Sequence, residues 1–308
     1  MKTTIYVPDI ECDSCVKILN KSFKSLNGVN SWEVMNDKVI FDHDSTRITE
    51  KEFVKIIKDR GFRAAPTPFE RKTIRERFRD FKENPKKYDL ERKGIRYTIY
   101  VFLLLGILEI LTYWAFLNKI EGFFQNYAIW FLYLTISVTF IGGALWHFYS
   151  YHAKVTCMVG MMIGMTVGMQ SGMMIGAIMG ATNGFFIGAT VGMIIGVIVG
   201  TMTGTCCGVM GIMEGMMAGL MGGTMGPMIS LMMFFDHLEL FMPLYMLINL
   251  IILGGLSYML FEEVVEHNQS VRKKPVEFVT FASISIVVTL VLSVITVYGP
   301  KSSFVIGG

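Results

Sequence analysis

The chain has 308 residues, of which 52% are hydrophobic and 17% are charged, and its formal net charge is +3. This composition excludes an ordinary soluble globular protein and predicts an integral membrane protein with several spans. The charged residues concentrate in the first hundred positions and around Arg272, so we expect a soluble domain to precede the membrane domain.

Residues 1–66 have the pattern of a small α+β domain. Alternating apolar residues predict strands, Asn36-Asp37 predicts a hairpin turn, and Gly61 predicts the end of a helix. The expected strands cover 3–7, 31–35, 38–42 and 62–65, and the expected helices end near Leu26 and begin near Thr49. Four strands therefore alternate with two helices.

Two cysteines lie in the loop after the first expected strand, in the sequence Cys12-Asp13-Ser14-Cys15. This spacing favours a metal site in a reducing compartment over a disulfide framework. The order strand, Cys-x-x-Cys, helix, Gly-Val, hairpin, helix, Gly-Phe-x-Ala resembles the heavy-metal-associated domain family, which includes soluble copper chaperones and the amino-terminal domains of metal-pumping ATPases. The matching residues are Cys12, Cys15, Gly28, Val29, Val39, Phe41, Ile56, Gly61, Phe62 and Ala64.

The resemblance implies a ferredoxin-like βαββαβ fold in which the thiolates of Cys12 and Cys15 bind a soft monovalent ion such as Cu(I). Phe62 is similar to the version of the domain that is attached to membrane transporters. Two alternatives stay open, namely a redox-active Cys-x-x-Cys and a degenerate domain that binds no metal.

Residues 67–96 form a basic connector, with eleven Lys or Arg against five Asp or Glu between positions 71 and 96. Ile74, Phe78 and Phe81 are spaced along one helical face, which predicts an amphipathic helix on an anionic lipid surface or a solvated linker helix. In both cases the positive-inside rule places the connector on the cytosolic side.

The membrane domain is expected to cover 97–308, and its main feature is a glycine at every fourth position from Gly160 to Gly208. Each four-residue step turns by about 40° around a helix axis, and the series would be roughly 73 Å long, so it must be divided among several helices. Such rows let helix backbones approach closely in lipid, which predicts glycine-zipper packing.

About seven spans are predicted from the apolar runs and the loop charges. Three of them lie in the glycine-rich region, with breaks at the polar positions 182–183 and 201–205. The other four are expected at about 97–117, 126–149, 240–260 and 278–298. This arrangement predicts a protein of the cell membrane with a cytosolic amino terminus and an external carboxyl terminus.

Methionines follow the glycine rows in two ladders with a spacing of four residues. The candidate metal ligands are Met161, Met165, Met169 and Met173 in the first ladder and Met213, Met217 and Met221 in the second. Thioether sulfur suits Cu(I) or Ag(I), although methionine is also a flexible filler of uneven interfaces. The combination of Met-x-x-x-Met with Gly-x-x-x-Gly resembles short motifs of the high-affinity copper transporter family.

Further candidate groups lie inside the expected spans. Cys206-Cys207 resembles the membrane-embedded pair of mercuric ion transporters and is a candidate exchange site, with Cys157 at the start of another span. Glu109 and Glu214 are candidates for proton coupling, because a carboxylate inside a span is costly and by default functional. The alternative is a protonated carboxyl that bonds across helices.

The sequence contains no phosphate-binding loop and no phosphorylation motif, so we expect neither a primary pump nor an enzyme. The predicted function is membrane transport of Cu(I), with Ag(I) and Hg(II) as alternative ions. Expected partners are the bilayer, a soluble metallochaperone and further copies of the chain, but no nucleic acid. Mercuric ion uptake and a non-transporting metal sensor or scaffold are the competing hypotheses.

Overall fold

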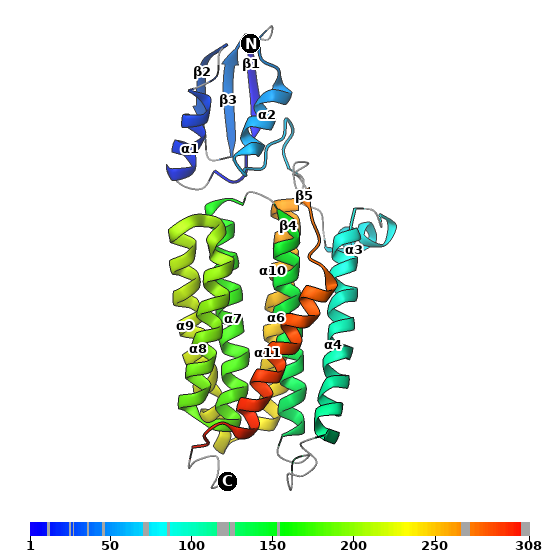
Figure 1. Ribbon diagram of the computed structural model, residues 1–308. Coiled ribbons are helices and arrows are strands. Elements are labelled where there is room, and N and C mark those ends of the chain that lie inside the picture. The colour runs from blue at the N-terminus through cyan, green and yellow to red at the C-terminus, as the bar shows by residue number, and fades with distance from the viewer. Residues whose placement is uncertain are drawn as a thin grey trace. The chain divides into compact units, whose positions relative to one another are not determined.

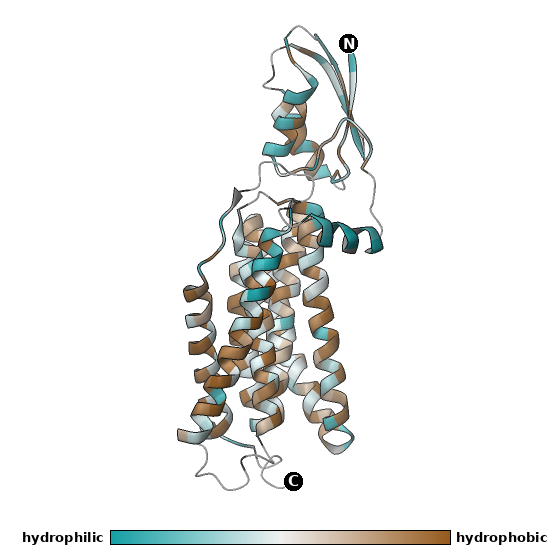
Figure 2. Cartoon of the chain, turned by 90° about the vertical axis from the view of Figure 1, so that its right-hand side faces the viewer, coloured by the Kyte–Doolittle hydropathy of each residue, from teal (hydrophilic) through white to brown (hydrophobic). Residues whose placement is uncertain are grey.

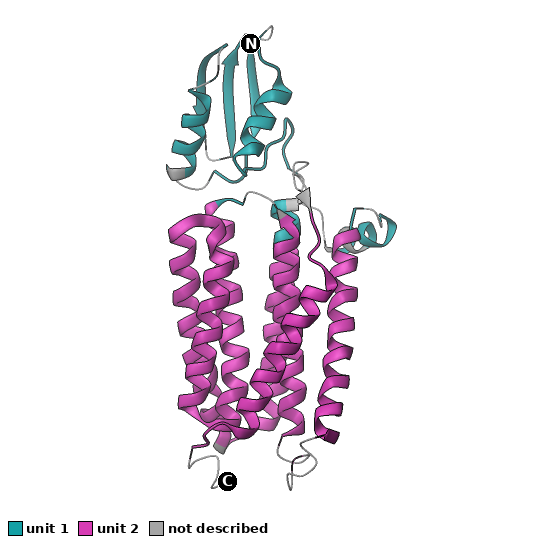
Figure 3. Cartoon of the chain, in the orientation of Figure 1, with its two compact units in different colours: residues 1–88, 152–156, 259–273 teal, residues 89–151, 157–258, 274–308 magenta. Residues whose placement is uncertain are grey.

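The computed structural model describes residues 1–10, 13–24, 26, 28–35, 37–44, 47–69, 74–84, 87–115, 123, 127–152, 155–265 and 272–302. The chain is mostly helical and carries a small sheet near its amino terminus (Figure 1). It divides into two compact units, which Figure 3 shows in different colours. The first unit comprises residues 1–88, 152–156 and 259–273, and the second comprises 89–151, 157–258 and 274–308.

The amino-terminal sheet has three antiparallel strands in the order β1-β3-β2. The elements are β1 Lys2–Tyr6, α1 Asp13–Phe23, β2 Val29–Val34, β3 Lys38–His43 and α2 Glu50–Asp59. They follow the expected order. The strand expected at 62–65 is reduced to a single bridge between Tyr6 and Ala65, on the edge of β1 that β3 leaves open.

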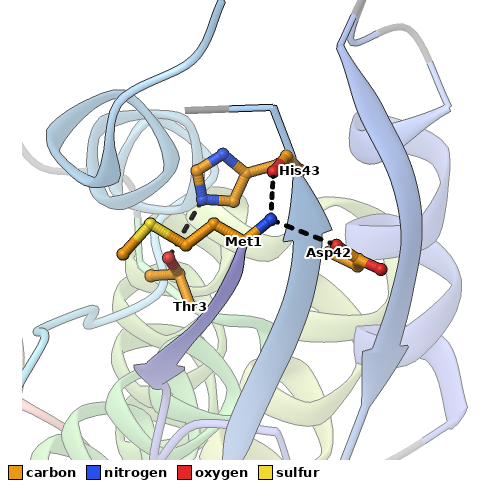
Figure 4. A network of polar contacts seen from close by, with 4 residues as sticks. All are labelled: Met1, Thr3, Asp42 and His43. Carbon is orange, nitrogen blue, oxygen red and sulfur yellow. Dashed lines mark hydrogen bonds and ion pairs between the residues drawn. The ribbon is translucent and has the colours of Figure 1, made fainter. Parts of the chain in front are cut away.

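The sheet and its two helices enclose an aromatic core. Phe41 of β3 stacks on Phe53 of α2, with ring centroids 4.2 Å apart, and Phe23 of α1 meets Phe41 edge-on. At one end of the sheet the Met1 amino group donates to the His43 carbonyl at 2.7 Å (Figure 4). The same figure shows the Thr3 hydroxyl 2.9 Å from Nε2 of His43, so side chain and backbone together tie β1 to β3.

The connector contains α3 Ile74–Glu83 and the first turns of α4 Asp89–Ala115. The boundary expected at position 97 therefore falls inside a continuous helix. Phe81 packs against Tyr88, and Tyr88 stacks on Phe261 within the first unit. The side chains of Ile74 and Phe78, which were expected to share its apolar face, lie outside the described residues.

Within the described residues, six helical stretches are long and apolar enough to cross a membrane, which supports an integral membrane protein. They are α4, α6 Ala128–Ser150, α7 Cys157–Asn183, Phe185–Met232, Leu238–Val264 and α11 Phe278–Tyr298. Figure 2 shows their apolar colouring and the hydrophilic colouring of α3. The stretch Phe185–Met232 contains α8 Phe185–Gly204, the short 3-10 turn η2 Thr205–Cys207 and α9 Gly208–Met232. The remaining elements are β4 Tyr151–His152, η3 Met233–Phe235, α10 Leu238–Leu260, the π-helical turn η4 Phe261–Val265 and β5 Arg272–Lys273.

Both breaks predicted in the glycine-rich region are confirmed. α7 ends at Asn183, immediately before Gly184, and α8 ends at Gly204, just before the turn that leads to Gly208. Gly184 and Gly208 have φ angles of 101° and 68°, which side chains with a Cβ rarely adopt. Glycine at these two positions therefore lets the chain reverse direction on either side of α8.

Glycine-zipper packing of α7, α8 and α9 is also visible. A Cβ added at Gly200 would lie 2.7 Å from the carbonyl carbon of Gly215, and one at Gly204 would lie 2.6 Å from that of Gly211. On the other side, a Cβ at Gly168 would lie 2.8 Å from the Cα of Gly200. The three helices, which we call the glycine bundle, thus meet backbone to backbone, and α8 runs antiparallel to both of its neighbours.

Candidate metal centre

The amino-terminal candidate site is described in part. Cys12 lies outside the described residues, whereas Cys15 lies in α1, half-buried, and packs against the aromatic core of the domain. The loop before them is fixed by Asp9, whose carboxylate accepts hydrogen bonds from the Arg63 backbone N–H at 2.7 Å and from its Nε at 2.8 Å. Burial alone would lower the pKa of Arg63, but the hydrogen bond and charge of Asp9 raise it above its ordinary value.

Replacing Asp9 by asparagine is expected to loosen the segment that follows β1, where Asp9 holds Arg63. The carboxylate and guanidinium are 11% and 19% exposed, so losing the charge leaves Arg63 buried without its anion, at a cost of about 1–3 kcal/mol. Amide hydrogen exchange in β1 and β3 is the measurement, and exchange should become faster. Asp42→Asn is the matched control, because Asp42 is 40% exposed and its pair with the Met1 amino group contributes little. Equal exchange in the two variants would contradict the role given to Asp9.

The second candidate site gathers three thiols at one end of the glycine bundle. Cys157 is the first residue of α7, and Cys206 and Cys207 form the turn η2 between α8 and α9. The close approach of α7 and α9 to the end of α8 brings these segments together, since a Cβ at Gly164 would lie 3.0 Å from the Cα of Gly204.

The contacts among the thiols are direct. The Sγ atoms of Cys206 and Cys207 are 3.8 Å apart, and the Cys206 thiol donates to the Thr203 carbonyl at 3.3 Å. Cys157 hydrogen-bonds with Cys207 and interacts electrostatically with Cys206. We call Cys157, Cys206 and Cys207 the thiol cluster.

The spacing of the vicinal pair fits a shared metal ion better than a disulfide. A disulfide needs its sulfurs about 2.05 Å apart, which the pair reaches only after rearrangement. With metal–sulfur bonds of about 2.3 Å, two thiolates on one trigonal or tetrahedral ion lie roughly 3.8–4.0 Å apart, whereas linear coordination needs about 4.6 Å. The observed 3.8 Å is the ordinary contact distance of two hydrogen-bonded thiols, and it also lies within reach of one shared ion.

Other features of the cluster also favour thiolate chemistry. α7 and α9 both begin at this end of the bundle, and the amino terminus of a helix favours negative charge. Among the described residues, no group of three or more His, Cys, Asp or Glu side chains has the geometry of a formed metal site. The cluster is therefore a pair of sulfurs with a third thiol beside it, rather than a preassembled cage.

The methionine ladders lie mainly on the outside of the glycine bundle. Met213, Met217 and Met221 of α9 are 58%, 59% and 50% exposed, and Met165 of α7 is 41% exposed. The other members of the first ladder, Met161, Met169 and Met173, are half-buried.

Glycines rather than methionine side chains form the contact between α7 and α9. A Cβ at Gly222 would lie 3.0 Å from the Cα of Met169, and one at Gly226 would lie 3.0 Å from that of Met173. Each step of a ladder also turns by about 40°, so a ladder winds around its helix instead of forming a straight seam.

The two intramembrane carboxyls differ in their surroundings. Glu109 of α4 shares a hydrogen bond with the buried hydroxyl of Thr135 on α6, so it links two helices. Glu214 is half-buried on α9, between the exposed Met213 and the buried Gly215. The hydrogen bond between Thr135 and Glu109 joins α6 to α4, and it fits both roles considered for this carboxyl, proton coupling and a structural cross-helix bond.

Sequence reasoning identified the vicinal pair but gave Cys157 less weight, because Cys157 is some fifty positions away. The sequence feature that could have linked Cys157 to the pair is its position at the start of a helix with a row of glycines, since such a helix packs closely against the helices that follow it. Comparisons with family models, curated proteins and solved structures find no match to this chain, so its function must be inferred from the contacts described above.

Proposed function

We propose that this protein transports a soft monovalent metal ion, Cu(I) before Ag(I), across the membrane, with the divalent Hg(II) as the alternative ion. The observation that carries the proposal is the thiol cluster, because a vicinal pair of soft ligands with a third thiol beside it lies at the end of helices that otherwise carry few polar groups. Thiolates select Cu(I) and similar ions over Mg(II) or Ca(II). The amino-terminal domain supplies a second dithiol, Cys12 and Cys15.

The proposal also includes the fold of the amino-terminal domain, the number of membrane crossings and the orientation of the chain. The order β1, α1, β2, β3, α2, with β1 between β3 and Ala65, supports a ferredoxin-like heavy-metal-associated domain. α8 and α9 have 20 and 25 residues and pack antiparallel, and each is long enough for a hydrocarbon core of about 30 Å, which supports seven crossings. With the positive-inside rule applied to the basic connector, the proposal has the amino terminus and the thiol cluster on the cytosolic side and the carboxyl terminus outside.

Transfer between the two dithiols proceeds by ligand exchange. A bond from the ion to the sulfur of Cys207 forms as its bond to Cys15 or Cys12 breaks, and Cys206 then replaces the remaining thiolate. The protons of the Cys206 and Cys207 thiols pass to the departing thiolates of Cys12 and Cys15, so the number of bound protons is unchanged. No electron is transferred, and the oxidation state of the ion stays the same. The ion is never released to water, which suits a soft metal that cytosolic thiols would otherwise capture.

Beyond the thiol cluster, the proposed route of the ion runs along the methionine ladders, and the exposure of these methionines decides how a site can form there. Because the ladder face of α9 is open in a single chain, methionine sulfurs can enclose an ion only where a second copy covers that face. Successive thioether sites of moderate affinity would let the ion enter and leave. The proposal therefore includes a homo-oligomer.

Met165→Leu combined with Met217→Leu is expected to reduce Cu(I) flux into proteoliposomes severalfold, since leucine keeps the side-chain volume and removes the sulfur. The matched control is Met202→Leu, which changes a methionine of α8 that is 52% exposed and belongs to neither ladder. Flux is measured as uptake with an encapsulated Cu(I) indicator. If the ladder variant and the control transport equally well, the ladders only contact lipid or pack helices.

A second candidate function is a metal-binding membrane protein that does not transport. The backbone-to-backbone glycine contacts and the exposed α9 ladder favour it, because they leave the centre of the glycine bundle filled by the chain itself. It predicts stoichiometric Cu(I) binding at the thiol cluster with no flux in the same proteoliposomes. Preference for Zn(II) over Cu(I) in direct titration would count against both functions.

A further inference from the structure

A separate group of helices, α4, α6 and α11, packs together outside the glycine bundle. A Cβ added at Gly143 of α6 would lie 3.4 Å from Cγ2 of Thr98 on α4, and one at Gly142 would lie 3.5 Å from Oγ of Ser285 on α11. Tyr97 of α4 also contacts the ring of Phe278 on α11. Each of the three helices thus touches the other two.

Two helices of this group, α6 and α11, carry buried hydroxyls. Thr135 and Thr139 of α6 and Thr289 of α11 are at most 1% exposed. The hydroxyls of Thr139 and Thr289 have no hydrogen-bond partner within the described part of the chain. Lipid offers no replacement, and an unpaired hydroxyl in an apolar environment costs about 1–3 kcal/mol.

The helix register places these hydroxyls near one another. Gly142 lies beside Ser285, and Trp146, one turn later on α6, donates to the carbonyl of Val276, which precedes α11, so the two helices run antiparallel. Thr139 is one turn back from Gly142, and Thr289 is one turn on from Ser285, so both lie on the same side of that contact. One more turn along α6 leads to Thr135.

Glu109 of α4 is joined to this row through its hydrogen bond with Thr135. The sequences of α6 and α11, the helices that pack most closely against α4, contain no Asp, Glu, Lys or Arg. The titratable side chains of these two helices are Tyr133, His147 and Tyr149 on α6 and Tyr298 on α11. Tyr133 interacts with Glu239, the ring of His147 contacts that of Tyr151, and Tyr149 interacts with Cys206. No counter-charge from these helices balances an ionised Glu109.

We propose that Glu109 is a proton-binding site and that the hydroxyls of Thr135, Thr139 and Thr289, bridged by water, form the proton's route into the α4–α6–α11 group. A neutral carboxyl avoids the cost of at least about 2.5 kcal/mol for a charge inside a span. Hydroxyl groups both donate and accept, so each can pass a proton on while keeping its own. The site is independent of the thiol cluster, so a test of proton binding at Glu109 does not depend on whether the protein transports a metal ion.

Infrared difference spectroscopy of the reconstituted protein during a pH change tests the proposal. The unmodified protein should show a protonated-carboxyl C=O band that shifts in heavy water, and Glu109→Gln should remove it. Glu214→Gln is the control and should retain the band. A band that survives Glu109→Gln, or that disappears only with Glu214→Gln, overturns the assignment.

The role of the hydroxyls is tested by the double variant Thr139→Val with Thr289→Val, which keeps the shape and removes both oxygens. The titration midpoint of the Glu109 band should shift, and proton–deuterium exchange at the carboxyl should slow at least tenfold. Thr139→Ser with Thr289→Ser restores the hydroxyls and should restore both readouts. Unchanged midpoint and exchange in the valine variant would show that the hydroxyls take no part.

Discussion

Gly215→Ala is expected to break the contact between α8 and α9 and to lower the thermal stability of the protein strongly. The added Cβ would lie 2.5 Å from the carbonyl carbon of Gly200 and closer still to its oxygen. Both atoms belong to the backbone, so no side-chain rotation relieves the clash and the helices must separate. Overpacking of this kind costs about 1–3 kcal/mol and more where the backbone cannot move.

The matched controls are Gly106→Ala in α4 and Gly254→Ala in α10, where an added Cβ would have no neighbour within 4 Å. Alanine is the better helix former by about 1 kcal/mol in water, so these variants should be as stable as the unmodified protein or slightly more stable. Unfolding temperatures in detergent, followed by the loss of the monodisperse peak in size-exclusion chromatography, provide the comparison. If Gly215→Ala unfolds at the same temperature as the two controls, backbone approach at Gly215 does not limit the stability of the protein.

The same close packing explains why the helix ends could be predicted from the sequence. Glycine rows and polar interruptions act locally, so the sequence predicts breaks at 182–183 and 201–205, and α7 and α8 end at Asn183 and Gly204. The start of α4 at Asp89 was missed, because charged residues suggested a connector while the helix continued through them. In the amino-terminal domain, strand alternation predicted the order of elements but not that the last strand would shrink to the bridge at Ala65.

The orientation of the methionines could not be predicted in the same way. In water, an apolar side chain is driven inward, but in lipid an apolar side chain is equally stable outside. The composition of α9 therefore does not determine whether Met213 and Met217 face lipid or a neighbouring helix. They are exposed because the glycines of α9 form its contacts with the neighbouring helices. The thiol cluster depended on the fold for a similar reason, since only the antiparallel return of α8 brings Cys157 to Cys207.

Cys206→Ser combined with Cys207→Ser is expected to abolish Cu(I) binding by the membrane helices. The test uses the full chain with Cys12→Ser and Cys15→Ser, so that the amino-terminal dithiol does not mask the result. Serine keeps the size but offers a hard oxygen, so affinity should fall by at least about 100-fold, or roughly 2.8 kcal/mol. Competition with a coloured Cu(I) chelator measures the affinity, and the unfolding temperature confirms that the variant is folded.

Cys157→Ser in the same background separates a three-sulfur site from a pair. Cys157 interacts with both members of the vicinal pair, so we expect it to complete the coordination as a third thiolate. X-ray absorption of the bound Cu(I) should then show three sulfur neighbours in the parent and two in Cys157→Ser, with longer bonds in the parent. The affinity of Cys157→Ser should be lower than that of the parent but higher than that of the double variant. Two sulfurs in both proteins, with unchanged affinity, would mean that the vicinal pair opens to a linear site and that Cys157 only packs beside it.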